Sequence, residues 1–222
     1  TKKYIALKLK RWYCMNEITK EGCVEMKIQA VLIDGFKNIS NVRILFDNIT
    51  ALVALNNFGK SNVLSGIDFG LDFIKASIED KKDMMSNSNL IPINCSMIGK
   101  NYKYEMEVST DIDGKEYIIQ YGYEFEWKDN EDKKPRIVSE FLKAKLNEKG
   151  QKFTQLINRT ADTAFYKSSE TGRCSSKIKV EEAELVANKL RAYDELYYAK
   201  IITKLNGCLL YTSPSPRDKR QS

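Results

Sequence analysis

The sequence predicts an α/β fold in which a strand, a phosphate-binding loop and a helix are followed by an antiparallel β-subdomain. The first observation is the string Gly59-Lys60-Ser61, which stands between an almost wholly apolar segment and an amphipathic one. The second is the stretch from Ile93 to about Phe165, where alternating and aromatic-rich segments are separated by turn residues. Such a stretch is typical of antiparallel strands joined by hairpins.

Three strands are expected before the loop. Lys27–Ile33 is apolar and β-rich, and the turn residues Asp34 and Gly35 follow it. Val42–Phe46 predicts a second strand. Ile49–Leu55 is nearly all apolar, as expected for a strand that is buried on both faces of a sheet.

A helix is expected from Lys60 to about Ala76, because apolar residues recur on one face at Val63, Leu64, Ile67, Leu71 and Ile74. Gly66 and Gly70 lie four residues apart in this helix, and we expect them to allow close packing against a sheet. The polar stretch Glu79–Leu90 predicts a short helix and a loop.

The second part of the chain predicts an antiparallel meander and then a long helix. The expected strands are Tyr102–Val108, Glu116–Trp127 and Arg136–Leu146. The helix is expected from about Val180 to Leu205, because one apolar stripe recurs at three- and four-residue steps. We expect this stripe to pack into the core; it comprises Val186, Leu190, Tyr193, Tyr197, Ile201 and Leu205.

Composition narrows the classes of function. The 222 residues include no run of about 18 apolar residues, so no membrane partner is expected. The absence of histidine excludes catalysis and metal binding by that side chain. Five scattered cysteines, none in a CxxC pair, disfavour a zinc site and fit a reducing, cytoplasmic location.

The net charge of +6 is concentrated at the two ends of the chain. Residues 1–25 carry six Lys or Arg against three Glu, and residues 208–222 carry three against one Asp. Residues 26–207 carry 27 basic and 26 acidic side chains and are therefore nearly neutral. DNA is consequently not indicated as a partner by the charge of this middle part.

The segment Ala54–Ser61 matches the P-loop pattern G-x-x-x-x-G-K-[ST], except that Ala54 replaces the first glycine. In such a loop, backbone N–H groups surround the β-phosphate of a nucleotide. Gly59 would permit close approach of the backbone, and Lys60 would contact the β- and γ-phosphates. The Ser61 hydroxyl would bind Mg²⁺. The expected cofactors are therefore ATP and Mg²⁺, and the nucleotide-binding candidates are Asn56, Asn57, Phe58, Gly59, Lys60, Ser61 and Asn62.

Two strands and then a strand leading into Asn-Asn-Phe-Gly-Lys-Ser-Asn resemble the N-terminal part of ABC-type ATPase heads, which include the SMC, RecF and OLD groups. The stretch Met26–Ser77 is most similar to bacterial AAA family ATPases and ATP-binding proteins related to OLD. The resemblance implies a P-loop NTPase fold with an antiparallel subdomain. Gly35–Asn38 resembles an aromatic–basic element near the nucleotide, which makes Lys37 a further candidate; a solvated turn lysine is the alternative.

The resemblance implies ATP binding and, in the full-length protein, ATP hydrolysis as a homodimer of heads in phage defence or DNA maintenance. The Walker B strand and signature sequence of such ATPases are expected beyond this chain, so no catalytic residue is assigned. The alternative function is a nucleotide-gated binding or sensing module without hydrolysis.

The two ends predict a truncated domain. Cys208–Asp218 resembles a translated sequencing adapter, so residues 208–222 are expected to be an artefactual tail; a natural disordered tail is the alternative. Residues 1–25 are expected to be a non-native or disordered lead, with Met26 as a candidate start. Residues 26–207 would then form the N-terminal part of an ATPase domain.

Overall fold

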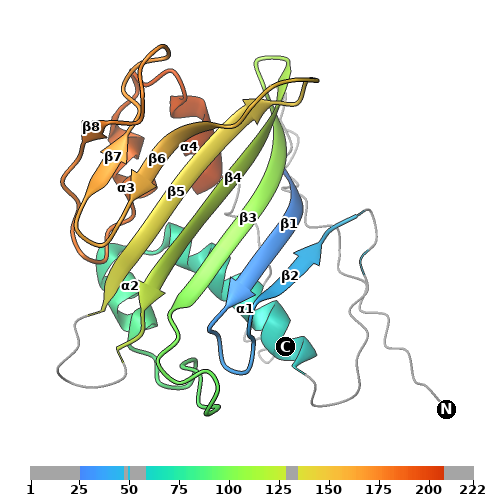
Figure 1. Ribbon diagram of the computed structural model, residues 1–222, viewed down its shortest axis with the longest axis vertical. Coiled ribbons are helices and arrows are strands. Elements are labelled where there is room, and N and C mark those ends of the chain that lie inside the picture. Colours follow the sequence, from blue (N-terminus) through green and yellow to red (C-terminus); the bar gives the residue numbers. More distant parts are fainter. Residues whose placement is uncertain (1–25, 48–49, 51–58, 129–134, 208–222) are drawn as a thin grey trace, which may run out of the picture.

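A computed structural model of the protein describes residues 26–47, 50, 59–128 and 135–207 (Figure 1). The lead over 1–25, the tail over 208–222 and nearly all of the expected strand Ile49–Leu55 lie outside the described residues. The described elements form one sheet and a set of helices that share a single hydrophobic core.

The sheet has eight strands in the order β2-β1-β3-β4-β5-β6-β7-β8. Every neighbouring pair is antiparallel. The long strands match the predicted ones closely, and Arg136–Leu146 has the predicted bounds. The strands are β1 (Met26–Asp34), β2 (Val42–Leu45), β3 (Tyr102–Ile112), β4 (Lys115–Glu126), β5 (Arg136–Leu146), β6 (Thr154–Arg159), β7 (Ala164–Tyr166) and β8 (Ser176–Lys177).

The expected α/β fold of the P-loop NTPase type is wrong for the described residues, because they contain one antiparallel sheet and few helices. Strands joined by tight turns must pair antiparallel, and that local connection dominates here. Asp113 and Gly114 both have positive φ, at 55° and 75°, and close the β3–β4 hairpin. The chain between β2 and β3 contains α1 and α2, and β3 then runs antiparallel to β1. The predicted antiparallel meander is confirmed.

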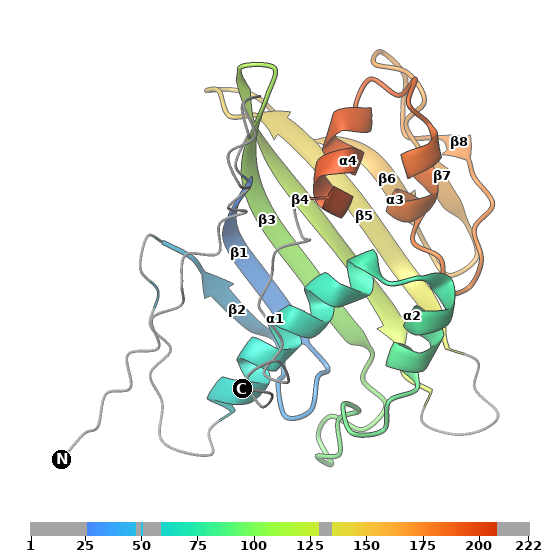
Figure 2. The ribbon, with the colours of Figure 1, turned by 180° about the vertical axis from the view of Figure 1, so that it is seen from behind.

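All the described helices lie on one face of the sheet, as Figure 2 shows. They are α1 (Lys60–Lys75), α2 (Ile78–Met85), α3 (Val186–Lys189), a 3₁₀ turn (Leu190–Ala192) and α4 (Ala199–Gly207). The long helix expected up to Leu205 is wrong, because the chain leaves the helical conformation at Tyr193, with φ −109° and ψ 72°. This break buries Tyr198 and turns Tyr197 outward, where it is 45% exposed.

Helix α1 packs very closely on β3 and β4, as its two glycines predicted. A Cβ atom added at Gly70 would lie 2.1 Å from the ring of Tyr104. The hydroxyl of Tyr102 donates a hydrogen bond to the carbonyl of Gly66 at 3.1 Å. The hydroxyl of Tyr123 donates in the same way to the carbonyl of Gly70 at 2.8 Å. Gly70 therefore leaves the space in which tyrosine side chains from the sheet lie against the helix, whereas Gly66 faces Ile33 and Phe36.

An aromatic layer fills the space between α1 and the sheet. The ring of Phe73 stacks on Tyr123 and on Phe125, with both centroid distances at 4.9 Å. Phe69 contacts Trp127 at 5.8 Å. Burial raises the pKa of Tyr123 well above its ordinary value, so its hydroxyl remains a donor. The one-face prediction for α1 missed Phe69 and Phe73, because this helix buries more than a single stripe.

Three buried charged side chains tie the C-terminal segment to the rest of the core. Glu140 on β5 accepts hydrogen bonds from the backbone N–H of Val186 at 2.6 Å and of Ala187 at 2.9 Å. Arg159 on β6 donates to the carbonyls of Glu181, Glu182 and Glu184. Lys81 on α2 donates to the carbonyl of Ala76 and, at 2.9 Å, to the side chain of Asn188.

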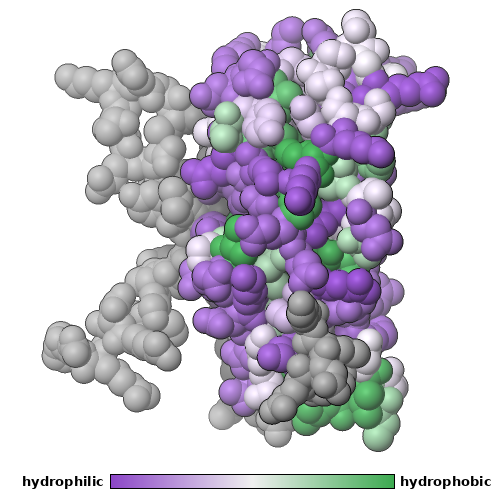
Figure 3. Space-filling model, turned by 90° about the vertical axis from the view of Figure 1, so that its left-hand side faces the viewer, coloured by the Kyte–Doolittle hydropathy of each residue, from purple (hydrophilic) through white to green (hydrophobic). Residues whose placement is uncertain are grey.

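The opposite face of the sheet is charged and polar. Side chains that alternate with the core residues point there, among them Lys103, Glu105, Glu107, Gln120 and Glu124. Figure 3 shows that the flank of the molecule with β7 and β8 is also mainly hydrophilic. Among the described residues, no helix is both long enough and apolar enough to cross a membrane.

Candidate functional site

The start of α1 carries the described part of the predicted phosphate-binding loop. Gly59 precedes the helix with φ 84° and ψ 9°, a left-handed conformation that favours glycine. The carbonyl of Gly59 accepts the first helical hydrogen bond, from the N–H of Val63 at 2.9 Å. Lys60 and Ser61 therefore occupy the first helical turn, where N–H groups have no partner within the helix.

The electrostatics of this helix end favour an anion. The aligned peptide dipoles of a helix place partial positive charge at its N-terminus. The first turn of α1 contains Lys60 and no acidic residue, and Lys75 stands in the last turn. Eight residues of α1 are buried, so the helix end is held by the core rather than by the loop alone. The arrangement provides a fixed, positively charged group of donors.

The turn after β1 is firmly held next to this helix end. Asp34 accepts hydrogen bonds from the backbone N–H of Asn41 at 2.9 Å and from the ammonium of Lys100 at 3.0 Å. These contacts lower the pKa of Asp34 against the opposing effect of its burial. The indole N–H of Trp127 donates to the carbonyl of Gly35 at 2.9 Å. The turn is consequently held by residues just before β3 and just after β4, which lie at the same end of the sheet.

Asn38 links this turn to the start of α1. Its side-chain oxygen accepts a hydrogen bond from the amide of Asn62 at 2.8 Å. A Cβ atom added at Gly59 would lie 3.1 Å from the Asn38 amide nitrogen. A larger residue at position 59 would therefore press on the turn as well as being strained at its positive φ.

The structure brings several predicted residues together. Gly59, Lys60, Ser61 and Asn62 lie at the start of α1, and the turn that carries Lys37 lies beside them. The Lys37 ammonium stands 5.6 Å from the centroid of the Phe36 ring. Its backbone has φ 50°, and its N–H donates to the carbonyl of Leu90 at 2.9 Å. Asn56, Asn57 and Phe58 lie outside the described residues.

Asn38 is the residue that the sequence did not assign to the site. It belongs to the short element Gly35–Asn38, in which only the basic side chain was singled out. An asparagine in a turn commonly hydrogen-bonds to the backbone close to it, so the pairing of Asn38 with Asn62, 24 residues away, had no local signal.

Comparisons with known proteins do not identify a relative. No model of a protein family matches the sequence. No curated protein matches it either. The residues at the start of α1 and their geometry are therefore the basis on which a function is proposed below.

Proposed function

We propose that this protein binds a nucleoside triphosphate, ATP in the first instance, through the start of α1. The observation that carries the proposal is the left-handed Gly59 followed by Lys60 and Ser61 in a first turn free of carboxylates. Backbone N–H groups at a helix start bind phosphate oxygens, and an adjacent ammonium adds a charge-assisted contact.

Mg²⁺ fits the same end of the helix. The Ser61 side chain is exposed in the first turn, so its hydroxyl is available to a cation that also contacts phosphate oxygens. Bound Mg²⁺ would neutralise phosphate charge next to Lys60. Lys37, on the neighbouring turn, would add a second ammonium from outside the helix.

The test is a titration of the full chain with ATP, with and without Mg²⁺, by isothermal titration calorimetry. Lys60→Ala should weaken binding about tenfold or more, because a hydrogen bond to a charged phosphate is lost. Ser61→Ala should weaken binding only when Mg²⁺ is present. Lys149→Ala, at an exposed turn, is the matched control and should bind as the unaltered chain does.

Equal affinity of the unaltered chain and Lys60→Ala would show that the start of α1 is not the site. Circular dichroism of each variant checks that folding is retained. Phosphate release measured on the same samples separates the two expected functions: turnover supports an ATPase, and tight binding without turnover supports a sensing module.

A further inference from the structure

A cavity lies on the helical face of the sheet, near the β3–β4 hairpin. Its volume is about 600 Å³, within the usual range for small-molecule sites. It is bordered by the β3–β4 hairpin, the end of β5, the start of β6 and the segment that leads into α4. It shares no lining residue with the start of α1.

Buried apolar side chains form part of the lining, and lysines form much of the rest. Ile112, Ala144, Leu156, Leu196 and Ile201 belong to the hydrophobic core and also border the cavity. The charged lining residues are five lysines and three acids: Lys115, Lys145, Lys152, Lys167, Lys200, Asp113, Glu170 and Asp194. A site with apolar and cationic walls fits an organic anion better than a bare ion.

Two of these lysines are engaged, and the five lysines outnumber the three acids, so the lining has a net charge of +2. The Lys200 ammonium lies 2.6 Å from the Asp113 carboxylate, and that of Lys167 donates to the carbonyl of Glu170 at 2.7 Å. Lys145 stands over the ring of Phe153 at 4.9 Å from its centroid. The side chains of Lys115 and Lys152 make no hydrogen bond or ion pair with other described residues.

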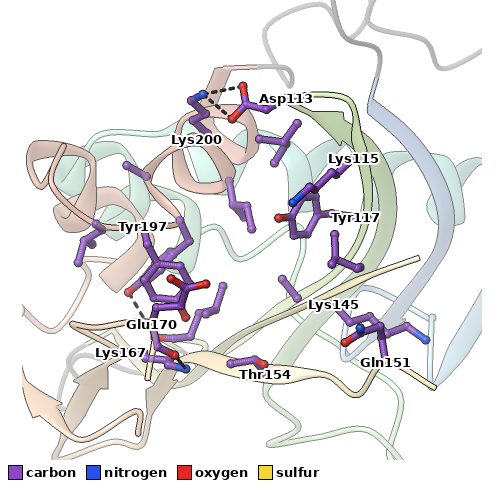
Figure 4. Close-up of a pocket in the computed structure, with 18 of the residues that line it drawn as sticks. Asp113, Lys115, Tyr117, Lys145, Gln151, Thr154, Lys167, Glu170, Tyr197 and Lys200 are labelled. Carbon is purple, nitrogen blue, oxygen red and sulfur yellow. Dashed lines mark hydrogen bonds and ion pairs between the residues drawn. The ribbon is translucent and has the colours of Figure 1, made fainter. Parts of the chain in front are cut away.

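Two tyrosine rings face the cavity from different elements. Figure 4 shows Tyr117 of β4 on one side and Tyr197, just before α4, on the other. Tyr197 is held edge-on against Tyr198, at 5.0 Å and 80° between the rings. The helical break at Tyr193 turns this large ring toward the cavity instead of the core. An exposed, positioned aromatic ring is a surface on which a flat ligand can stack.

We infer that this cavity binds a small aromatic anion, with its ring between Tyr117 and Tyr197 and its acidic group near Lys115 and Lys152. A nucleoside monophosphate has this chemistry, because it joins a flat base to a phosphate. Stacking uses the rings, and the phosphate supplies the counter-charge that the two lysines lack among the described residues. This site is independent of the proposed triphosphate site.

The experiment titrates the full chain carrying Lys60→Ala with AMP, so that the start of α1 does not contribute. AMP should bind, and adenosine and inorganic phosphate should each bind at least about tenfold more weakly. Tyr197→Ala should weaken AMP binding about tenfold, whereas Tyr197→Phe should retain it, because stacking needs the ring and not the hydroxyl.

Charge is tested with a matched pair of double variants. Lys115→Glu with Lys152→Glu reverses two lining charges and should abolish measurable AMP binding. Lys149→Glu with Lys177→Glu makes the same change in net charge at exposed positions outside the cavity and should leave binding unchanged. Absence of AMP binding, binding of phosphate as tight as that of AMP, or equal loss in both double variants would overturn the inference. Binding of decanoate in place of AMP would overturn it too.

Discussion

Lys81 shows how a single buried charge can be held in this core. Its side chain is 1% exposed, lies over the ring of Phe73 and donates to two oxygens, one at the end of α1 and one on Asn188. Burial lowers the pKa of Lys81 to about 8, and the neighbouring carboxylates, with Glu140 first, oppose this effect. The amine is therefore close to losing its proton near physiological pH.

Lys81 should make stability depend on pH. The folded state binds this proton less tightly than the unfolded chain, in which the pKa is near 10.5. The free energy of unfolding should therefore rise as pH increases from about 8 to about 10.5, by up to about 3 kcal/mol. Urea denaturation at several pH values, compared with Lys81→Met, isolates this contribution.

The control for Lys81 is its neighbour Lys82, whose side chain pairs with Glu79 at the surface. Lys82→Met should give no change in relative stability between pH 8 and 10, because contact with Glu79 raises the pKa of Lys82. A difference between the unaltered chain and Lys81→Met that stays constant with pH would contradict the prediction.

At the scale of elements, the contact of α1 with the sheet depends on its two glycines to different degrees. A Cβ atom at Gly66 would lie 3.2 Å from side-chain atoms of Ile33 and Phe36. At Gly70 it would lie 2.1 Å from the fully buried ring of Tyr104. That ring is packed in the aromatic layer and has no room to move aside.

Gly70→Ala should destabilise the protein by about 3 kcal/mol, because the helix must shift away from the sheet. Gly66→Ala is the matched control. The added methyl group at position 66 would press slightly on Ile33 and Phe36, at 3.2 Å. This cost opposes the gain of up to about 1 kcal/mol that alanine brings to a helix, so the net change in stability should be small. Chemical denaturation of both variants measures this; equal losses would show that the close approach is not centred on Gly70.

The sequence specified the elements better than it specified their assembly. The spacing of apolar residues and the positions of turn residues predicted helix α1 and strands β3 to β5. The predicted bounds agree with the observed ones within a few residues. The prediction of one continuous helix through Tyr193 and Tyr197 was wrong. The chain leaves the helical conformation at Tyr193, and Tyr198 is buried in place of Tyr197. The close approach at the glycines was predictable, but its tyrosine partners come from strands more than 30 residues away.

At the scale of the whole molecule, Glu140 joins the C-terminal segment to the sheet. Its carboxylate receives the N–H groups at the start of α3 and the hydroxyl of Tyr121 at 3.0 Å. Burial raises the pKa of Glu140, and the N–H donors and the charge of Arg159 act against that rise. One side chain thus supplies acceptors that α3 would otherwise lack.

Removal of these acceptors should loosen the whole C-terminal segment. Glu140→Ala should cost about 3–5 kcal/mol of unfolding free energy, because buried donors and a nearby arginine lose their counterpart. Glu140→Gln should cost less, about 1–3 kcal/mol, since one oxygen remains. Hydrogen exchange at the N–H groups of Val186 and Ala187 should accelerate in both variants.

The control for Glu140 is Glu182, whose side chain is exposed. Glu182→Gln should change stability by less than about 0.5 kcal/mol. If Glu140→Ala is no less stable than this control, the carboxylate does not hold the segment.

The fold class was the part that the sequence predicted least well. The string around Lys60 suggested an α/β fold of the P-loop NTPase type, whereas the described strands form an antiparallel meander extended by β1 and β2. Local patterns reveal each strand, but β1 pairs with β3 as well as with its neighbour β2. β3 lies about 70 residues further along the chain, and no local pattern encodes that pairing. At the candidate site, the helix start was predictable and its pairing with Asn38 was not.

The order of the strands also bears on self-association. Within the described part of the chain, the sheet ends at β2 on one side and at β8 on the other. These are short strands, four and two residues long, and each carries a basic side chain, Arg43 or Lys177. Long flat edges recruit strands from other copies, whereas short charged edges resist this. The sheet thus keeps its longest strands, β3 to β5, inside, where they cannot seed aggregation through exposed backbone.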